Sequence, residues 1–386
     1  MGSKADETEF VPNFTKENIP DWFCPVPFSN LIFNPWGNVG SCREQGNEHS
    51  VGDARRQTWQ EIWNGEKIRA WRREFLSGNI KTCAQHIRHR KCNKDGYNQE
   101  LIQHIELKEI QTTPPKRISP DFNGHCNLRC AMCTIWKQPN GLYDTLNFWE
   151  DAEKNLFPHL KQVDPLAGEP LIQKDTFRLM DIMGRVNPSA KWRITTNGHW
   201  KFTRFLRDKF DKIAVVGINF SLDAVTQEVY EKVRERGDIG VVLKAIDDIV
   251  QYRKDRIAAG HEDFVININM TVQTHNWREM GDLVSLCLEK GGLPLILMLY
   301  RPSELSLLTL DTESRQKIVD YYFETIDWEV LKYCRRPVMA LLESIPRSEL
   351  RDERMLRFAN HGTCAIPLNE KIPVLPGDMP GYQTEA

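Results

Sequence analysis

Runs of apolar residues alternate with amphipathic stretches along the chain after residue 115. Two stretches, Val241–Ala259 and Trp277–Lys290, carry apolar residues at the spacing of a helix that buries one face. Between such stretches lie short runs rich in β-branched and apolar residues, as strands are. These runs occupy residues 116–122, 160–167, 191–197, 215–223, 265–273 and 294–300. The alternation predicts parallel strands joined by crossover helices, which is an α/β fold.

The predicted strands are fewer than the eight of a complete β/α barrel. In barrels of this kind, the groups that carry chemistry gather at the carboxyl ends of the strands. Behind the last strand, residues 303–386 have helical patterns at Thr312–Thr325 and Trp328–Cys334, followed by a Pro-rich end. We expect this segment to cap the barrel mouth and to exclude water from it.

Composition and charge are those of an ordinary globular protein. The chain has 386 residues, of which 40% are hydrophobic and 27% charged, with a formal net charge of -2. No overall basic field favours nucleic acid or an anionic membrane, and no apolar run approaches the roughly 18 residues that span a bilayer. We therefore expect neither nucleic acid nor a membrane as a partner. The basic groups at Arg72-Arg73 and residues 88–91 are expected to be solvated surfaces.

The cysteines are numerous and unevenly placed. Ten cysteines without a signal peptide indicate a reducing, cytoplasmic setting in which thiolates ligate metal. Four cysteines precede a tight triplet and three are scattered behind it. In chain order they are Cys24, Cys42, Cys83 and Cys92, then Cys126, Cys130 and Cys133, and finally Cys287, Cys334 and Cys364. This grouping predicts two metal sites.

The triplet Cys126, Cys130 and Cys133 has the spacing C-x3-C-x2-C within the segment from His125 to Cys133. A 4Fe-4S cluster normally takes a cysteine on each of its four irons, so this segment leaves one iron open for a ligand that is not protein. The alternative is three cysteines of a zinc knuckle or of a buried apolar loop. The spacing resembles the signature of the radical S-adenosylmethionine (SAM) superfamily.

This resemblance implies a fold, cofactors and a reaction. The expected fold is a partial (β/α)6 TIM-like barrel over residues 106–302, with its initiating cluster on the three cysteines. In the family, SAM binds the open iron through its amino and carboxylate groups. One electron from the cluster then cleaves SAM to a 5'-deoxyadenosyl radical, which abstracts hydrogen from the substrate. Met132, before the last cysteine, stands where the family packs an apolar side chain on the adenine.

Two further motifs follow the second and third predicted strands. Ala167-Gly168-Glu169-Pro170 resembles the family's Gly-Gly-Glu-Pro turn, which hydrogen-bonds the methionine amino group of SAM. Ala167 replaces the first glycine, which is tolerable where φ stays negative. Thr195-Thr196-Asn197-Gly198 is a polar strand end that usually faces cofactor or substrate. Gly168, Glu169, Thr196 and Asn197 are therefore candidate SAM-binding residues.

The fourth and sixth strands also end in polar residues. Ser221 and Asp223 resemble the family segment that reaches the ribose hydroxyls of SAM, and a hydroxyl and a carboxylate both accept protons from a diol. The alternative is a plain helix start with Asp223 or Thr226 as its N-cap. After the sixth strand, Tyr300 and Arg301 are candidates, with Arg301 either pairing with a carboxylate or beginning a surface loop.

The residues ahead of the barrel resemble the SPASM and twitch accessory domains of the family. The matching features are Cys24, a Gly37-x4-Cys42 hairpin, a Trp-rich helical stretch over residues 59–71, and Cys83 followed by Cys92. The tryptophans of that stretch are expected to be core. The resemblance implies a small α+β auxiliary cluster domain over residues 1–105, placed before the barrel where the best-known members carry it behind.

The resemblance also implies a ligand set for the auxiliary site. His86 stands where a second cysteine would be, so we expect one auxiliary 4Fe-4S cluster on Cys24, Cys42, Cys83 and Cys92. His86 or Cys364 is an alternative ligand. Because tetrahedral thiolate sites also suit zinc, a four-cysteine zinc site is the other interpretation.

The expected reaction is an oxidative one. The adenosyl radical removes hydrogen from a peptide, and the substrate radical returns an electron to the auxiliary cluster, leaving a double bond or crosslink. Alternatives are a dehydrogenase of an amino sugar or alcohol, and a redox-neutral epimerase with Cys334 or Cys364 as hydrogen donor. A non-catalytic iron-sulfur protein is disfavoured by the SAM-type motifs. The expected partners are a peptide or small polar substrate and an electron donor such as flavodoxin or ferredoxin.

Overall fold

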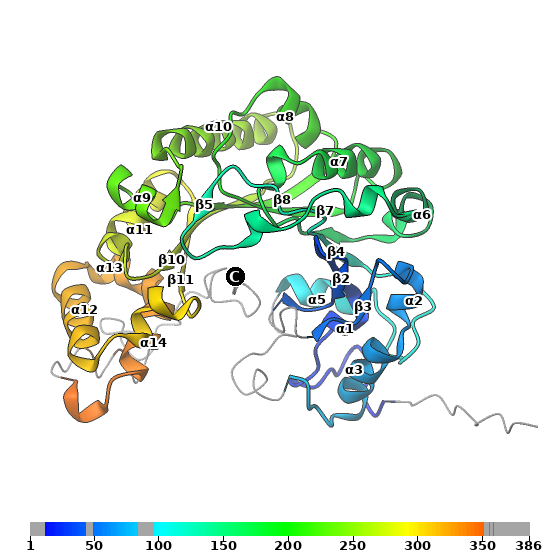
Figure 1. Ribbon diagram of the computed structural model, residues 1–386, viewed down its shortest axis with the longest axis horizontal. Helices are drawn as coiled ribbons and strands as arrows, with labels where there is room; N and C mark the ends of the chain where they lie inside the picture. Colours follow the sequence, from blue (N-terminus) through cyan, green and yellow to red (C-terminus); the bar gives the residue numbers. More distant parts are fainter. Residues whose placement is uncertain (1–11, 44–48, 84–95, 351–354, 356–357, 359–386) are drawn as a thin grey trace, which may run out of the picture.

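A nine-stranded sheet forms the centre of the protein, in the order β11-β10-β8-β7-β6-β4-β1-β2-β3 (Figure 1). The computed structural model describes residues 12–43, 49–83, 96–350, 355 and 358. Neighbouring strands from β4 to β11 are parallel and follow the order of the chain. They are β4 (Arg117–Pro120), β6 (Gln162–Val163), β7 (Lys191–Thr196), β8 (Ala214–Ser221), β10 (Val265–Val272) and β11 (Leu293–Met298). The predicted α/β class is confirmed, and this strand order is that of a partial (β/α)6 barrel.

The crossover helices lie along the outer side of this sheet, from the right of Figure 1 across its top to its left. They are α6 (Phe148–Asn155), α7 (Lys174–Val186), α8 (Arg204–Phe210), α9 (Gln227–Val233), α10 (Ile239–Ala258) and α11 (Met280–Glu289). Helix α10 begins at Asp238, whose side chain accepts a hydrogen bond from the Gly240 amide and caps the first turn. It buries Val242, Ile246 and Ile249 at helical spacing. Both helices predicted from periodicity are thus confirmed, the second as a short 3-10 turn leading into α11.

Strand β7 shows the alternation of buried and half-buried side chains that is expected of a strand. In β7 the side chains of Trp192, Ile194 and Thr196 are buried and the intervening ones are half-buried, as expected for alternating faces. Burial of Ile194 contributes about 1.5–3 kcal/mol. Strand β6 is much shorter than the predicted run of residues 160–167, because Pro165 has no N–H to continue the ladder.

The segment before the barrel extends the same sheet. It consists of α1 (Val26–Ser29), β1 (Asn30–Phe33), β2 (Asn38–Gly40), β3 (Gly52–Asp53), α2 (Trp59–Trp63), α3 (Glu66–Ser77) and α5 (Gly96–Ile102). Strand β1 pairs in parallel with β4, with Leu31 opposite Ile118, while β2 and β3 are antiparallel. The predicted hairpin is confirmed. The sheet therefore runs across the domain boundary expected at residues 105 and 106, which stays a prediction.

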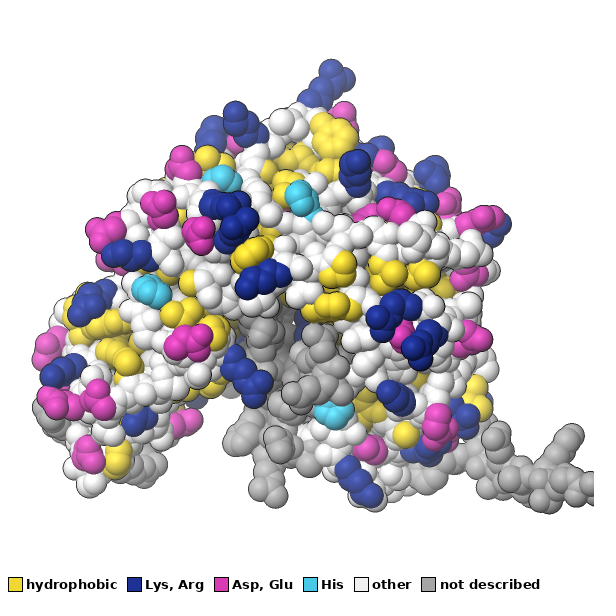
Figure 2. All heavy atoms as spheres, in the orientation of Figure 1, with side chains coloured by type: hydrophobic (Ala, Val, Ile, Leu, Met, Phe, Trp, Pro, Cys, Tyr) yellow, Lys and Arg dark blue, Asp and Glu magenta, His cyan; other side chains and the backbone are white. Residues whose placement is uncertain are grey.

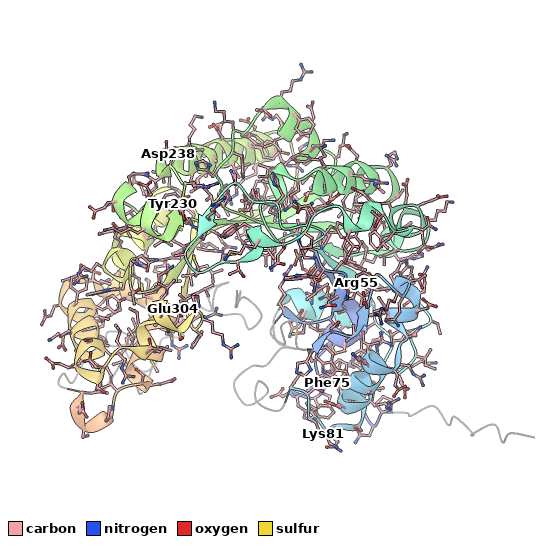
Figure 3. The ribbon with its side chains drawn as sticks, viewed as in Figure 1. Arg55, Phe75, Lys81, Tyr230, Asp238 and Glu304 are labelled. Carbon is pink, nitrogen blue, oxygen red and sulfur yellow. The ribbon has the colours of Figure 1, made fainter. Side chains whose placement is uncertain are left out.

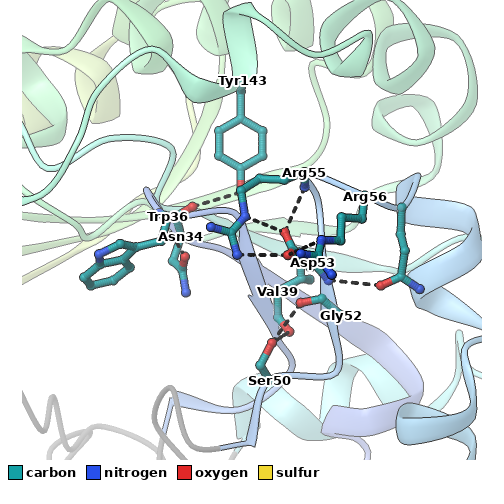
Figure 4. Close-up of polar contacts among 10 residues, drawn as sticks. Asn34, Trp36, Val39, Ser50, Gly52, Asp53, Arg55, Arg56 and Tyr143 are labelled. Atoms are coloured by element: carbon teal, nitrogen blue, oxygen red, sulfur yellow. Dashed lines mark hydrogen bonds and ion pairs between the residues drawn. The ribbon is translucent and has the colours of Figure 1, made fainter.

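The hairpin turn is tied to the barrel through Tyr143, whose hydroxyl donates to the Asn34 carbonyl oxygen at 2.9 Å (Figure 4). Gly37 adopts a φ of +89°, and a side chain there would meet the Arg55 side chain at 2.8 Å. Arg55 in turn pairs with Asp53 at 2.8 Å. Buried aromatic rings continue the contact between hairpin and barrel. They are Phe33, Phe122, Tyr143, Phe148 and Trp149.

The expected core tryptophans Trp59, Trp63 and Trp71 are buried, which confirms that interpretation. The expectation of a solvated basic surface is wrong for Arg72, whose relative exposure is 0%. Its guanidinium lies over the Trp63 ring at 4.2 Å and donates to the Pro27 carbonyl oxygen at 2.9 Å. The second basic group, residues 88–91, lies outside the described residues.

The segment after β11 forms α12 (Thr312–Thr325), α13 (Trp328–Leu331), a 3-10 turn (Lys332–Cys334) and α14 (Arg335–Glu343). The two helical patterns predicted here are confirmed. Helix α14 packs against β11, and α12 buries Ile318, Val319 and Tyr322. No helix among the described residues combines the length and apolarity needed to cross a membrane.

Candidate functional site

Three thiols lie on one loop that leaves the carboxyl end of β4; we refer to residues 123–138 as the cluster loop. Cys126, Cys130 and Cys133 are each half-buried there. Burial raises the pKa of the Cys126 thiol to about 12, and it also raises the pKa values of Cys130 and Cys133. Thiolates are the form that ligates metal, and a bound cation would favour deprotonation of these buried thiols.

The cluster loop is seated on the turn that follows β6. Gly168 has a φ of +65°, and a Cβ on it would lie 2.4 Å from the His125 carbonyl oxygen. The same oxygen accepts from the Glu169 amide at 2.9 Å and from Gln173 Nε2 at 3.0 Å. Ala167 is not among the described residues with positive φ, so its methyl group is compatible with the turn, as predicted.

Glu169 lies fully buried between the β6 turn and the end of β7. Its carboxylate accepts from Thr196 Oγ1 at 2.7 Å, the Asn197 amide at 2.6 Å and the Leu171 amide at 3.0 Å. Burial raises the pKa of Glu169 to about 7, while these hydrogen bonds oppose that rise. Both oxygens are engaged within the protein, so this carboxylate mainly holds the turn, and the amide and carbonyl of Ala167 are likewise bonded to Asp121 and Gln173.

An amide network joins the end of β7 to the cluster loop. Asn197 Nδ2 donates to Asn127 Oδ1 at 2.9 Å and lies 3.6 Å from Cys126 Sγ. Asn127 Nδ2 donates to the His199 carbonyl oxygen at 2.6 Å. His199 Nε2 accepts from the amide of Asp238, which Figure 3 labels at the start of α10. Hydrogen bonds to cluster sulfurs are a known means of setting cluster properties.

A buried ion pair stands behind the second cysteine. Residues Arg129 and Cys130 form a short strand, β5 (Arg129–Cys130), that pairs antiparallel with β9 (Arg234–Glu235). The Arg234 guanidinium lies 3.5 Å from Cys130 Sγ and 2.6 Å from Asp223 Oδ2. Burial alone would lower the pKa of Arg234, but the carboxylate of Asp223 and the thiol of Cys130 raise it above its usual value. Arg234 is thus a permanent cation beside a cluster ligand.

Asp223 therefore has a role inside the protein. Its Oδ1 accepts from the Thr271 amide at 2.6 Å, and its φ of 64° lies in the left-handed region. The helix-start alternative is confirmed for Thr226, which caps α9 by accepting from the Val229 amide. Contact of Asp223 or of the half-buried Ser221 with ribose stays a prediction.

Two polar side chains at the carboxyl end of β10, Asn269 within the strand and Gln273 just after it, lie at the same edge of the sheet. Asn269 is the register partner of Ser221, and Gln273 Nε2 lies 3.8 Å from Met132 Sδ. Within the described residues, Asn269 Oδ1 and Gln273 Oε1 are buried without a hydrogen-bond partner, and so is the Tyr230 hydroxyl, labelled on α9 in Figure 3. Unpaired buried polar atoms are costly, so these atoms fit a polar ligand beside Met132.

The two remaining candidate residues for SAM binding are Tyr300 and Arg301, which follow β11 and are exposed. Their predicted contact with SAM stays a prediction. No group of three or more His, Cys, Asp or Glu side chains in the described part of the chain is arranged around a single metal ion. Among residues whose roles sequence reasoning missed, Asn127 lies within the cluster loop, and Gln173 and Arg234 contact it directly.

The proposed auxiliary ligands are described in part. Cys24 and Cys83 are buried and Cys42 is half-buried, whereas Cys92, His86 and Cys364 lie outside the described residues. The ligand set and the choice between iron and zinc stay predictions. Arg43, next to Cys42, pairs with Asp121 Oδ2 at 2.7 Å. Asp121 Oδ1 accepts from the Ala167 amide at 2.9 Å, which links this region to the turn under the cluster loop.

The sequence profile of the radical SAM superfamily matches residues 122–287, and that of the SPASM iron-sulfur cluster-binding domain matches residues 24–94. The chain therefore carries a radical SAM domain with a SPASM domain ahead of it. The first domain implies a 4Fe-4S cluster with SAM, and the second implies auxiliary iron-sulfur clusters. The three thiols and the unpaired acceptors beside Met132 fit these groups.

Relatives of different activities share parts of the chain. A GTP 3',8-cyclase of Saccharophagus degradans is 32% identical over 125 residues, 32% of this chain and 35% of the relative. The mycofactocin maturase MftC of Mycobacterium ulcerans is 26% identical over 204 residues, 52% of this chain and 51% of the relative. The chain thus spans about a third to a half of the length of these curated relatives. The crystal structure of SuiB from Streptococcus suis shares 14% identity with a TM-score of 0.38, covering 78% of this chain and 72% of SuiB.

Proposed function

We propose that this radical SAM enzyme oxidises a peptide, by dehydrogenation or crosslinking, and returns an electron to an auxiliary cluster in its SPASM domain. When bound, the cluster and SAM supply the one-electron chemistry that removes hydrogen from an unactivated carbon. Cys126, Cys130 and Cys133 hold the cluster, and Met132 with the acceptors of β10 bounds the place of SAM. The backbone at Gly168 positions the methionine end.

The observation that carries this proposal is the short connection between the two cysteine groups. Arg43, the residue after Cys42, donates a hydrogen bond to the Asp121 carboxylate. That carboxylate also accepts a hydrogen bond from the amide of Ala167. The next residues of that turn bind the cluster loop through the His125 carbonyl oxygen. An auxiliary cluster held by Cys42 would therefore keep a fixed position relative to a cluster held by the cluster loop. Return of an electron from the substrate to the auxiliary cluster requires such a fixed position. The maturase MftC supports a peptide as the substrate class.

The redox-neutral alternative finds less support. An epimerase needs a thiol that reaches the substrate, and Cys334 has a relative exposure of 0%. Its thiol points to the Val330 carbonyl oxygen at 3.8 Å, and burial raises its pKa above the usual range. Cys287 is also buried, as expected for a core residue. Cys364, the other candidate donor, lies outside the described residues, so we favour the oxidative outcome on the burial of Cys334 and Cys287 alone.

The test is anaerobic reconstitution followed by reduction with dithionite in the presence of SAM. Formation of 5'-deoxyadenosine is expected, and its absence would contradict the enzyme assignment. Iron near eight atoms per chain would support two clusters, whereas about four would leave the SPASM site without one. Cys42→Ser should lose about half of the iron, and Cys334→Ser should lose none. Solvent deuterium in an otherwise unchanged product would favour the epimerase instead.

A further inference from the structure

The indole of Trp136 connects the protein surface to a cluster ligand. Trp136 follows Cys133 in the cluster loop, and its Nε1–H donates to the Cys133 carbonyl oxygen at 3.0 Å. The ring is half-buried, so one part faces solvent while the other is bonded to the backbone of the ligand residue. No step of the proposed reaction uses this side chain.

Two cations flank the exposed part of this ring. The Arg129 guanidinium lies 4.8 Å from the Trp136 ring centre and the Lys137 ammonium lies 5.0 Å from it. Within the described residues neither cation has an ion-pair partner, unlike Arg178, which pairs with Asp144. We refer to Arg129, Trp136 and Lys137 as the basic indole patch.

Across the β5–β9 pair, the register partner of Arg129 is Glu235, which pairs with Arg236 at 4.0 Å. The sixteen residues of the cluster loop, 123–138, contain no Asp or Glu. On the face shown in Figure 2, Lys and Arg side chains lie beside hydrophobic ones over β5, with Asp or Glu side chains close by. An unpaired cationic patch with an aromatic centre is complementary to an acidic protein surface, and such complementarity acts mainly on the rate of association.

We propose that the basic indole patch is the docking surface for an acidic one-electron carrier protein, and that the electron enters through Trp136. This inference rests on the proposed function, because it identifies the partner of the same cluster. In the step, the reduced carrier loses one electron and the oxidised cluster gains it, and no bond forms or breaks. The hydrogen bond from the indole to Cys133 supplies the protein's connection between the docking surface and the ligand.

The experiment compares two reductants on the reconstituted holoenzyme. Cluster bleaching is followed by stopped-flow absorbance, with reduced flavodoxin as the acidic carrier or with dithionite as a small reductant. Arg129→Gln combined with Lys137→Gln should lower the second-order rate with flavodoxin by about 10-fold or more at low salt, and remove most of its salt dependence. The rate with dithionite should be unchanged.

A matched control is available at another stacked cation and indole pair. Arg278 lies over the Trp277 ring at 4.0 Å, so Arg278→Gln removes a cation from a similar stacked pair. It should leave the flavodoxin rate unchanged. Trp136→Phe keeps an aromatic ring but loses the N–H, and it should lower the limiting rate at saturating flavodoxin.

The outcomes separate docking from the proposed function. Equal flavodoxin rates in the double variant and the wild type would overturn the docking surface, even if the enzyme forms 5'-deoxyadenosine. A loss of rate with dithionite as well would also overturn it, because that result indicates damage to the cluster or a role in binding substrate. If the wild type forms no 5'-deoxyadenosine while flavodoxin bleaches its cluster through the patch, the proposed function fails and the docking surface stands.

Discussion

Replacing Arg234 by methionine tests whether its ion pair with Asp223 holds the cluster loop against the barrel. The two side chains are 8% and 1% exposed, and the pair distance is 2.6 Å. Removing one partner of a buried pair leaves the other charge uncompensated, which costs about 3–5 kcal/mol. We expect Arg234→Met to lower the free energy of unfolding by about that amount, and to weaken cluster retention because Cys130 loses its neighbouring cation.

The assay is anaerobic urea unfolding of the reconstituted protein, followed by tryptophan fluorescence at neutral pH. Arg253→Met is the matched control, since Arg253 and Asp263 are also 2.6 Å apart but are 29% and 52% exposed. That exposed pair should be worth about 1 kcal/mol or less. Asp223→Asn should recover part of the loss in Arg234→Met, because it removes the orphaned charge. Equal losses in Arg234→Met and Arg253→Met would refute the reasoning.

Three further predictions follow from the same region and its surroundings. Burial holds the pKa of Glu169 at about 7 against 4.5 for an exposed glutamate, so the folded state binds the extra proton between these values. The free energy of unfolding should therefore fall by about 3 kcal/mol as the pH rises from 4.5 to about 7. Glu169→Gln should flatten the pH profile of the urea midpoint. A profile that is the same in this variant and the wild type would contradict the raised pKa of Glu169. Gly168→Ala should lose both stability and bound iron, because its Cβ would lie 2.4 Å from a backbone oxygen, whereas Gly141→Ala has a similar φ of +77° but open space and should keep its iron. Equal iron losses in the two variants would argue against the contact. Cys334→Ala should keep full 5'-deoxyadenosine formation, measured by chromatography, and a large loss would place this thiol in the reaction.

Local patterns were enough to predict most of the fold. Periodicity located the six parallel strands and the helix α10, because burial on one face imposes the same spacing wherever the element lies. It failed where a local feature interrupted the ladder, as at Pro165, which shortens β6 to Gln162–Val163. The expectation of a solvated surface, which rested on the adjacent basic residues, also failed for Arg72. Its partners include the Pro27 and Glu109 carbonyl oxygens. Those partners are distant in sequence, and no short-range pattern reports them.

The candidate site, too, was predicted only where the residues lie close together in the sequence. Spacing within one loop predicted the three thiols, and a turn motif predicted Gly168 and Glu169 as candidate site residues. The residues that support them come from other strands: Asn127 is fixed by Asn197, and Arg234 reaches Cys130 through the pairing of β5 with β9. Sequence reasoning identified Asp223 as a polar strand end but could not show that its carboxylate faces Arg234.

The position of Asp121 shows how one side chain can join two metal-binding regions. One of its oxygens accepts from Arg43, next to Cys42, and the other accepts from the amides of Leu166 and Ala167. The side chain is nearly buried, so water competes little for these bonds. A shift of the SPASM segment relative to β4 would stretch the Arg43 contact and pull on the turn that seats the cluster loop. The ordering of this turn is therefore coupled to the packing of the SPASM segment.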